Sequence, residues 1–336
     1  MSQRAIQIGS ATAGPGELAR GGIEYGRDAL GRPLEIPVIV YNGAEPGPRL
    51  WINAGTHGDE PEGALAIFLL LQQIKIEELR GTVVAVPMLN PAGFVAGMRG
   101  DPLDTFSYDL NRVYPGKADG YATERLAYAH WHAMKDTCDL QIAIHSGGEH
   151  SFLSHMIFAS SHGLELAGAM GKGWKFVFDS ATGTGNPSSQ LAAAGVPAIT
   201  VERGGLCHTL TNDFHEIGED FCSSLLNVMR HYEMLPGSVS YESVWQVGHQ
   251  IALLAPAGGL FVGQRDLLFE TPIKAGIVLG RIYDCYGDLA AEITAPEDGV
   301  VFGLRSRPQV RPGDWCTFFG VIDGTVTNLL DARVVR

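Results

Sequence analysis

The stretch Trp51-Ile-Asn-Ala-Gly-Thr-His-Gly-Asp-Glu-Pro-Glu-Gly63 (WINAGTHGDEPEG) decides how the chain is interpreted. An apolar run typical of a buried strand ends at Gly55, and a histidine and three acidic residues follow within six positions. Because His57 and Glu60 are three residues apart, a turn or the first turn of a helix can direct both side chains to one point. Pro61 suits the first turn of a following helix. The stretch predicts a strand, a turn and a helix, with charged side chains where the strand ends.

Short apolar runs and helical segments alternate up to about residue 235. The runs predicted to be strands are 34–41, 50–55, 82–89, 139–145, 155–159, 174–178 and 197–202. The segments predicted to be helices are 63–74, 124–134 and 216–234. Strands that alternate with helices of this length predict an α/β fold, with a mostly parallel mixed sheet that helices cover on both faces.

The pattern of the sequence changes after residue 237. Residues 238–336 have no long helical pattern, and their short Val, Ile and Leu runs are separated by the turn signals PAGG, YGD, APEDG and RPGD. We therefore expect a catalytic α/β domain over residues 1–236 and a small all-β domain over residues 237–336.

Charge and cysteine content exclude several classes of protein. The 336 residues contain 24 Lys and Arg against 37 Asp and Glu, a net charge of −13, which argues against nucleic-acid and anionic-membrane partners. No two cysteines form a CxxC pair, so reduced thiols are expected. The cysteines are Cys138, Cys207, Cys222, Cys285 and Cys316. The first residues, MSQRAIQIGS, lack an apolar signal-peptide core, and we expect a cytoplasmic protein, with homo-oligomerisation left open.

Three ionisable residues far apart in the sequence follow or end predicted strands: His57, His145 and Glu202. Ligands of α/β proteins gather at the carboxyl ends of strands, so these side chains could converge. Two histidines and Glu60 would suit zinc, which takes three protein ligands and leaves one position for water. The alternatives are a surface turn for the HxxE pair and a hydrogen-bonded core histidine at position 145. A carboxylate that leaves a buried strand, as at Glu202, needs a partner or a function.

Residues 90–116 contain a second polar cluster, with Arg99, Asn111 and Arg112. Arginine binds carboxylates through two hydrogen bonds, so Asn111 and Arg112 would suit a substrate α-carboxylate, while Arg99 could stabilise an oxyanion. The alternative is a turn in which the arginines pair with neighbouring acids. Those acids are Asp101, Asp104 and Asp109. Asp59 and Glu62 are interpreted as a solvated turn or as residues behind the ligands.

Taken together, these motifs resemble the succinylglutamate desuccinylase/aspartoacylase family, which is related to zinc carboxypeptidases. The similarity covers roughly residues 50–235, and the segment after it resembles the family's second domain. The motifs, in the order typical of the family, are HGDE (57–60), NPAGF…R…DLNRVYPG (90–116), IAIHSGG (142–148) and PAITVERGG (197–205).

The resemblance implies a zinc-dependent hydrolase that cleaves the amide bond of a small N-acyl amino acid, with one zinc ion per chain. The metal ligands that it implies are His57, Glu60 and His145. It also implies Glu202 as general base and proton shuttle, and Arg99 as the partner of the carbonyl and oxyanion. Asn111 and Arg112 are implied to hold the substrate carboxylate.

The resemblance also bears on the substrate. Members that act on acyl-aspartate carry an extra arginine shortly before the base, yet residues 146–201 contain no Arg. The family also includes deacetylases of N-acetylated diamino acids such as N-acetyl-2,4-diaminobutyrate. We favour that type of substrate, because its cationic side chain could meet Glu149 or Asp179. Succinylglutamate desuccinylase, aspartoacylase and zinc carboxypeptidase activities are the alternatives.

A non-enzymatic alternative comes from residues 276–301, which resemble a biotinyl or lipoyl carrier hairpin. Such carriers need a lysine at the exposed turn. The only lysine after residue 237 is Lys274, which precedes that unit. We therefore interpret the C-terminal region as a lid or an oligomer-forming wall.

Overall fold

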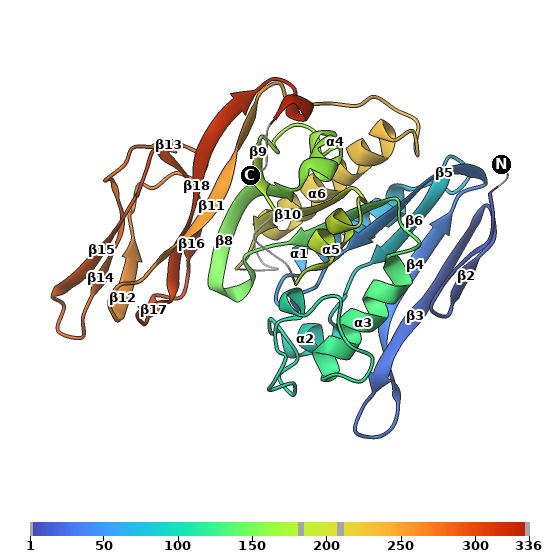
Figure 1. Cartoon of the computed structure of the whole chain (residues 1–336), viewed down its shortest axis with the longest axis horizontal. Coiled ribbons are helices and arrows are strands. Elements are labelled where there is room, and N and C mark those ends of the chain that lie inside the picture. Colours follow the sequence, from blue (N-terminus) through green and yellow to red (C-terminus); the bar gives the residue numbers. More distant parts are fainter. Residues whose placement is uncertain (1–2, 181–184, 207–211, 333–336) are drawn as a thin grey trace.

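The computed structural model describes residues 3–180, 185–206 and 212–332. Within these residues, twelve strands form one mixed sheet. The strands are β3 (Glu17–Arg27), β4 (Pro33–Asn42), β5 (Glu45–Asn53), β6 (Arg80–Val86), β7 (Leu140–His145), β8 (Ser151–Ala159), β9 (Phe176–Asp179), β10 (Ala198–Gly204), β11 (Trp245–Leu254), β13 (Pro272–Ile273), β16 (Gly299–Arg305) and β18 (Trp315–Val326). Their order across the sheet is β13-β16-β18-β11-β9-β8-β10-β7-β5-β6-β4-β3 (Figure 1).

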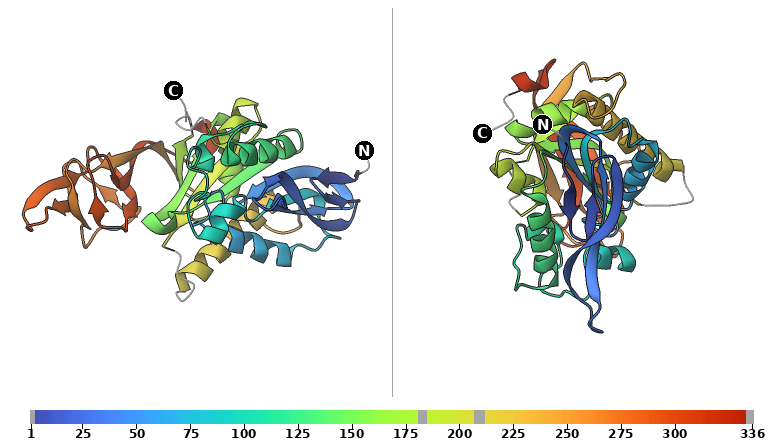
Figure 2. Two further views of the ribbon diagram at one scale, coloured as in Figure 1. Left: turned by 90° about the horizontal axis from the view of Figure 1, so that it is seen from below. Right: turned by 90° about the vertical axis from the view of Figure 1, so that its right-hand side faces the viewer.

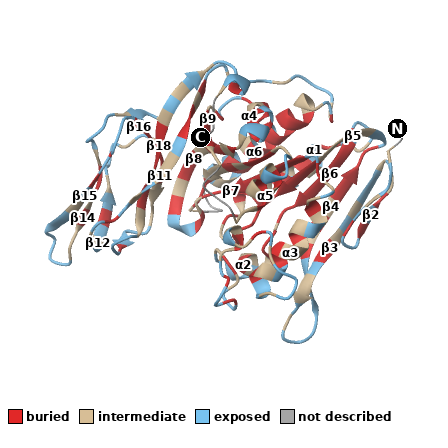
Figure 3. Ribbon diagram, viewed as in Figure 1, coloured by how far each residue is buried: buried red, intermediate tan, exposed pale blue. Residues whose placement is uncertain are grey.

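Helices cover both faces of this sheet, as predicted, and Figure 2 (right) shows the sheet edge-on between them. The first layer consists of α1 (Glu62–Gln73), α4 (Leu164–Ala169) and α6 (Asn212–His231). The second consists of α3 (Ala122–Met134), α5 (Pro187–Ala193) and the hairpin of β1 (Ile6–Ile8) and β2 (Ala11–Ala13). Leu50 and Ile52 pack in the first core and Trp51 packs in the second, since successive strand residues face opposite sides. This two-sided burial explains the continuous apolar runs of the central strands (Figure 3).

The strand directions correct one part of the prediction. The parallel pairs are β5–β6, β5–β7, β7–β10, β8–β9 and β9–β11. The other pairings of this sheet are antiparallel, including β3–β4 at one edge and β8–β10 near the centre. The sheet is therefore mixed, as predicted, but it is not mostly parallel, and that part of the prediction was wrong. Short connections such as residues 28–32 between β3 and β4 join antiparallel neighbours, whereas a parallel connection needs a long crossover.

The C-terminal region is built from strands, but it does not form a separate sheet throughout. Strands β11, β13, β16 and β18 extend the main sheet, because β11 pairs with β9 and β16 pairs with β8. A second sheet projects from the body of the molecule (Figure 2, left). It consists of β12 (Gly259–Gly263), β14 (Val278–Tyr283), β15 (Leu289–Thr294) and β17 (Gln309–Val310). The predicted boundary at residue 237 stays a prediction, and the main sheet continues across it.

The hairpin between β14 and β15 would be the place for a carrier lysine. Its turn contains Asp284, Cys285, Tyr286 and Gly287 instead, and Lys274 lies before β14, paired with Asp298. These positions do not support a biotinyl or lipoyl carrier.

The structure also shows the state of the cysteines and the character of the helices. The described cysteines are free thiols, of which Cys138, Cys222 and Cys316 are buried and Cys285 is exposed. Cys207 lies outside the described residues. Among the helices of the described segments, none has the length and apolar character needed to cross a bilayer.

Candidate active site

The carboxyl ends of β5, β7 and β10 lie side by side because these strands are parallel neighbours. The register of β7 and β10 pairs His145 directly with Glu202. His57 follows β5 after a short turn. These three residues are far apart in the sequence, and the structure places them at one edge of the sheet, as predicted.

The turn between β5 and α1 needs glycine at two positions. Gly55 has a φ of +62°, in the left-handed region that favours glycine. A side chain at Gly58 would overlap the carbonyl carbon of Gly93 and the amide nitrogen of Phe94, in the short helix α2 (Pro91–Ala96). The close approach of the turn to α2 places His57 beside Glu60.

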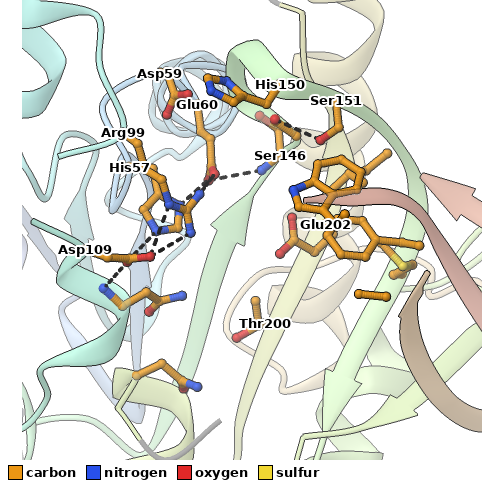
Figure 4. Close-up of a pocket in the computed structure, with 18 of the residues that line it drawn as sticks. His57, Asp59, Glu60, Arg99, Asp109, Ser146, His150, Ser151, Thr200 and Glu202 are labelled. Carbon is orange, nitrogen blue, oxygen red and sulfur yellow. Dashed lines mark hydrogen bonds and ion pairs between the residues drawn. The ribbon is translucent and has the colours of Figure 1, made fainter. Parts of the chain in front are cut away.

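Glu60 lies between the two histidines and contacts both. Figure 4 shows it beside His57. Its Oε1 is 2.6 Å from Nδ1 of His57, and its Oε2 is 2.8 Å from Nδ1 of His145. One ligand atom from each residue lies within 4.8 Å of the others, and all three side chains are buried. Two imidazoles and one carboxylate form a donor set that suits zinc. The residues present therefore fit a zinc ion.

Asp109 joins this trio to Arg99. Its Oδ2 accepts hydrogen bonds from Nε and Nη2 of Arg99 at 3.2 and 3.1 Å, and its Oδ1 is 3.2 Å from Nε2 of His57. Although burial raises the pKa of Asp109, the hydrogen bond with His57 and the charge of Arg99 hold it well below its usual range. The alternative that Arg99 pairs with an acid of its own loop is thus realised, yet Arg99 also lies 3.5 Å from Oε1 of Glu60.

Asp109 is a site residue that sequence analysis had considered only as a possible ion-pair partner. A carboxylate on the second nitrogen of a metal-binding histidine commonly fixes the orientation of the ring. One local signal was available: Asp109 caps the 3₁₀ helix η1 (Leu110–Arg112) by accepting a hydrogen bond from the amide of Asn111 at 2.9 Å. Its contact with His57 spans 52 positions and could not be inferred from the pattern.

Asn111 and Arg112 both line the cavity in front of the trio. The side-chain oxygen of Asn111 is buried without a hydrogen-bond partner among the described residues. Arg112 is exposed, and its Nη1 donates to the carbonyl oxygen of Asn111 at 3.0 Å. Their predicted role in carboxylate binding stays a prediction, and their positions are compatible with it.

Glu202 faces the same cavity beside His145. Its Oε2 is buried and has no hydrogen-bond partner among the described residues. Burial raises the pKa of Glu202 to about 8. A carboxyl group with such a pKa can both accept and donate a proton near neutral pH.

Of the two expectations for Glu62, the solvated turn is wrong, and a residue behind the metal ligands agrees with its position. It is fully buried and accepts hydrogen bonds from Oγ of Ser146 and from the amide of Gly205, both at 2.7 Å. Burial raises its pKa to about 7. Glu62 therefore ties together the chain that follows β7 and the chain that follows β10. Asp59 accepts from the amide of Glu149 at 3.1 Å.

The cavity has a volume of about 850 Å³ and is lined by both the α/β region and the C-terminal strands. Glu149, expected to meet a cationic substrate group, forms an ion pair with Arg307. Asp179 ends β9 and is not among the described residues that line the cavity. These positions do not support the expected contact between either acid and a cationic group of the substrate.

Comparisons with known proteins agree on one family. The model of the succinylglutamate desuccinylase/aspartoacylase catalytic domain matches residues 46–229. An N-alpha-acetyl-L-2,4-diaminobutyric acid deacetylase from Halomonas elongata is 30% identical over 302 residues, which cover 83% of each protein.

Solved structures show the same fold. A succinylglutamate desuccinylase from Silicibacter sp. has a TM-score of 0.79 and 24% identity, over 91% of this chain and 95% of that one. The product-bound ectoine utilization protein EutE (DoeB) from Ruegeria pomeroyi has a TM-score of 0.78 and 24% identity, with the same coverage.

Proposed function

Because the chain belongs to the succinylglutamate desuccinylase/aspartoacylase family, we propose that it is a zinc-dependent hydrolase that cleaves the amide bond of a small N-acyl amino acid. Members of this family are deacylases that act on N-acyl amino acids. The observation that carries the proposal is the buried trio of His57, Glu60 and His145 in one cavity with a carboxyl group, Glu202, that has an unpartnered oxygen.

His57, Glu60 and His145 would hold one zinc ion. When bound, zinc lowers the pKa of a water molecule and polarises a carbonyl oxygen. Asp109 would keep the His57 ring oriented through the 3.2 Å contact at its second nitrogen.

Glu202 would act as the general base and then as the general acid. Its unpartnered Oε2 can take a proton from water and pass it to the leaving amine. Its raised pKa suits this exchange, because the proton is neither lost nor held too strongly near neutral pH. Arg99 would direct guanidinium donors at the carbonyl oxygen, where negative charge develops.

Asn111 and Arg112 would bind the substrate's carboxylate at the other side of the cavity. The guanidinium offers paired donors, and the amide of Asn111 can add another. A fixed carboxylate would orient the scissile amide toward Glu202.

The favoured substrate is an N-acetylated diamino acid such as N-acetyl-2,4-diaminobutyrate. The name of the Halomonas relative supports it, as does the lack of arginine over residues 146–201. Succinylglutamate desuccinylase and aspartoacylase activities are the alternatives. A carboxypeptidase is disfavoured, because the C-terminal strands wall one side of the cavity. We place this activity in the cytoplasm, without a nucleic-acid or membrane partner.

A panel of N-acetyl, N-succinyl and N-formyl amino acids, assayed for release of free amine, tests the proposal. We expect hydrolysis that a strong chelator abolishes and added zinc restores. Activity that survives the chelator would contradict the metal assignment, and release of amine from short peptides alone would favour a carboxypeptidase.

A further inference from the structure

Several apolar side chains line the cavity beyond Glu202, on the side away from the metal ligands. The register across three neighbouring strands places His145, Glu202 and Met156 in one row. In the next row, Thr200 of β10 pairs with Phe158 of β8. Residues directly opposite on adjacent strands share a face of the sheet. An apolar surface therefore begins one strand away from the proposed base, on the side opposite the metal ligands.

The C-terminal strands continue this surface. Leu254 of β11 pairs with Trp315 of β18, and both line the cavity together with Phe318. The rings of Trp315 and Phe318 stack at 4.3 Å with an interplanar angle of 13°. We call Met156, Phe158, Leu254, Trp315 and Phe318 the apolar wall.

Met156 is buried, whereas the other residues of the apolar wall are partly or fully exposed. Arg305 lies over the Trp315 ring at 6.0 Å, and its Nη1 donates to the Trp315 carbonyl oxygen at 3.3 Å. Leu254 nevertheless keeps 53% of its surface exposed. Apolar surface inside a concave, otherwise polar cavity is typical of a ligand-binding site.

The size of the cavity agrees with a ligand larger than an acetylated small amino acid. Its 850 Å³ lies near the upper end of the range of roughly 300–1,000 Å³ that is usual for sites of drug-sized ligands. The metal ligands and the proposed carboxylate clamp occupy the α/β side. An acetyl group at the scissile amide would leave the apolar wall uncovered.

We propose that the apolar wall binds an apolar group of the substrate, of the size of an aromatic ring or a medium-length alkyl chain. Among N-acyl amino acids without a charged side chain, those that carry such a group, on the acyl side or on the amino-acid side chain, are then better substrates than N-acetylalanine. This inference rests on the proposed amide hydrolysis, but not on the preference for diamino acids.

Four substrates test the inference with zinc-loaded protein: N-acetylalanine, N-(phenylacetyl)alanine, N-acetylphenylalanine and N-acetyl-2,4-diaminobutyrate. We expect kcat/KM for at least one aromatic substrate to exceed that of N-acetylalanine by about tenfold or more. The two aromatic substrates distinguish the acyl side from the side-chain side. Equal rates for N-acetylalanine and both aromatic substrates would overturn the proposal, whereas the rate for the diamino acid tests the substrate choice of the proposed function.

Leu254→Asp should lower kcat/KM for the aromatic substrate by about tenfold more than it lowers kcat/KM for N-acetylalanine. Leu254 is exposed, so the substitution should not disturb the core. Leu289→Asp is the matched control: Leu289 is 54% exposed on β15 and is not among the described residues that line the cavity. It should change neither rate. A Leu254→Asp protein that slows all substrates equally would contradict the inference.

A measurement of substrate binding distinguishes this inference from the proposed function. Calorimetry on Glu202→Gln should show that the aromatic substrate binds more tightly than N-acetylalanine. Adding Leu254→Asp to that variant should abolish the difference in affinity. Such binding without hydrolysis by the wild-type protein would support the apolar wall and contradict the deacylase. Hydrolysis without any binding preference would contradict the apolar wall alone. Dissociation of an oligomer by Leu254→Asp, with substrate preference unchanged, would assign the wall to a second copy of the chain and overturn the inference.

Discussion

The two faces of β10 carry ionisable groups in opposite circumstances. Glu202 faces the cavity with a buried, unpartnered oxygen. Arg203, the next residue, faces the other side of the strand, because side chains alternate along a strand, and it forms an ion pair with Asp220 of α6. Asp220 also lies 3.0 Å from Nε2 of His155, whose Nδ1 lies 3.0 Å from Glu270. We call Arg203, Asp220, His155 and Glu270 the clasp.

Arg203 and its partners hold elements of the fold together, whereas Glu202 is left available for reaction. The clasp connects β8, β10 and α6 to the loop before β13, and its groups satisfy one another. Leaving a buried polar atom without a partner costs about 1–3 kcal/mol. The unpartnered Oε2 of Glu202 carries this cost, as is expected of a carboxyl group that takes part in a reaction.

The largest expected effect comes from Glu202→Gln. It should lower kcat by about 10²–10⁴-fold, because an amide cannot transfer the proton, while the zinc content stays normal. Steady-state kinetics and metal analysis measure the two quantities. Arg203→Gln, one residue away on the other face, should leave kcat nearly unchanged. A near-normal kcat for Glu202→Gln would mean that another group is the base.

The next effect concerns Asp109→Asn. The amide can still cap η1, but it loses the negative charge beside His57 and Arg99. We expect zinc affinity to fall by about 10–100-fold, measured by competition with a chromophoric chelator. Asp101→Asn in the same loop should leave the affinity unchanged. Equal affinities for both variants would restrict Asp109 to a role in the loop.

A smaller effect is expected from Arg112→Ala. Loss of a hydrogen bond to a charged group should raise KM for carboxylate-bearing substrates by about tenfold or more. The corresponding substrate amides should show little change, and kcat should stay close to normal for both. If KM rises equally for acids and amides, Arg112 does not bind the carboxylate.

The smallest expected effect is on the free energy of unfolding: it comes from the clasp and depends on pH. Burial lowers the pKa of His155, but hydrogen bonds with Asp220 and Glu270 outweigh this and raise it above the ordinary value. A raised pKa stabilises the folded protein below about pH 6.5, the unfolded value, and this contribution is lost as pH rises through the folded value. Two basic side chains face the same acids: Arg203 pairs with Asp220, and Nζ of Lys175 lies 3.9 Å from Glu270.

His155→Gln should therefore lower the free energy of unfolding by about 1–3 kcal/mol at pH 6 and by less at pH 9, measured by urea unfolding. His249→Gln removes an exposed histidine that pairs with Asp323 at 3.0 Å, and it should have no measurable effect at either pH. A His155→Gln difference that grows with pH would contradict the assigned direction of the pKa.

Much of the α/β region could be predicted because its signals are local. Apolar runs indicated β5, β7 and β10, and periodic patterns indicated α1, α3 and α6, each within a few residues of its bounds. Strand β3 was missed, because ELARGGIEYGR mixes glycines with exposed polar residues and has no strong alternation. The directions of the edge strands were also missed, since pairing is decided by contacts between distant segments.

The sequence by itself determined which side chains are available for chemistry: HxxE after one strand, a histidine at the end of another and a glutamate at the end of a third. Those choices are visible because residue type and strand ends are local properties. Only the tertiary structure decided that Asp109 contacts His57, that Glu62 is buried, and that Trp315 and Leu254 face the same cavity. These relations join residues 52 or more positions apart or depend on strand register, so no local pattern encodes them.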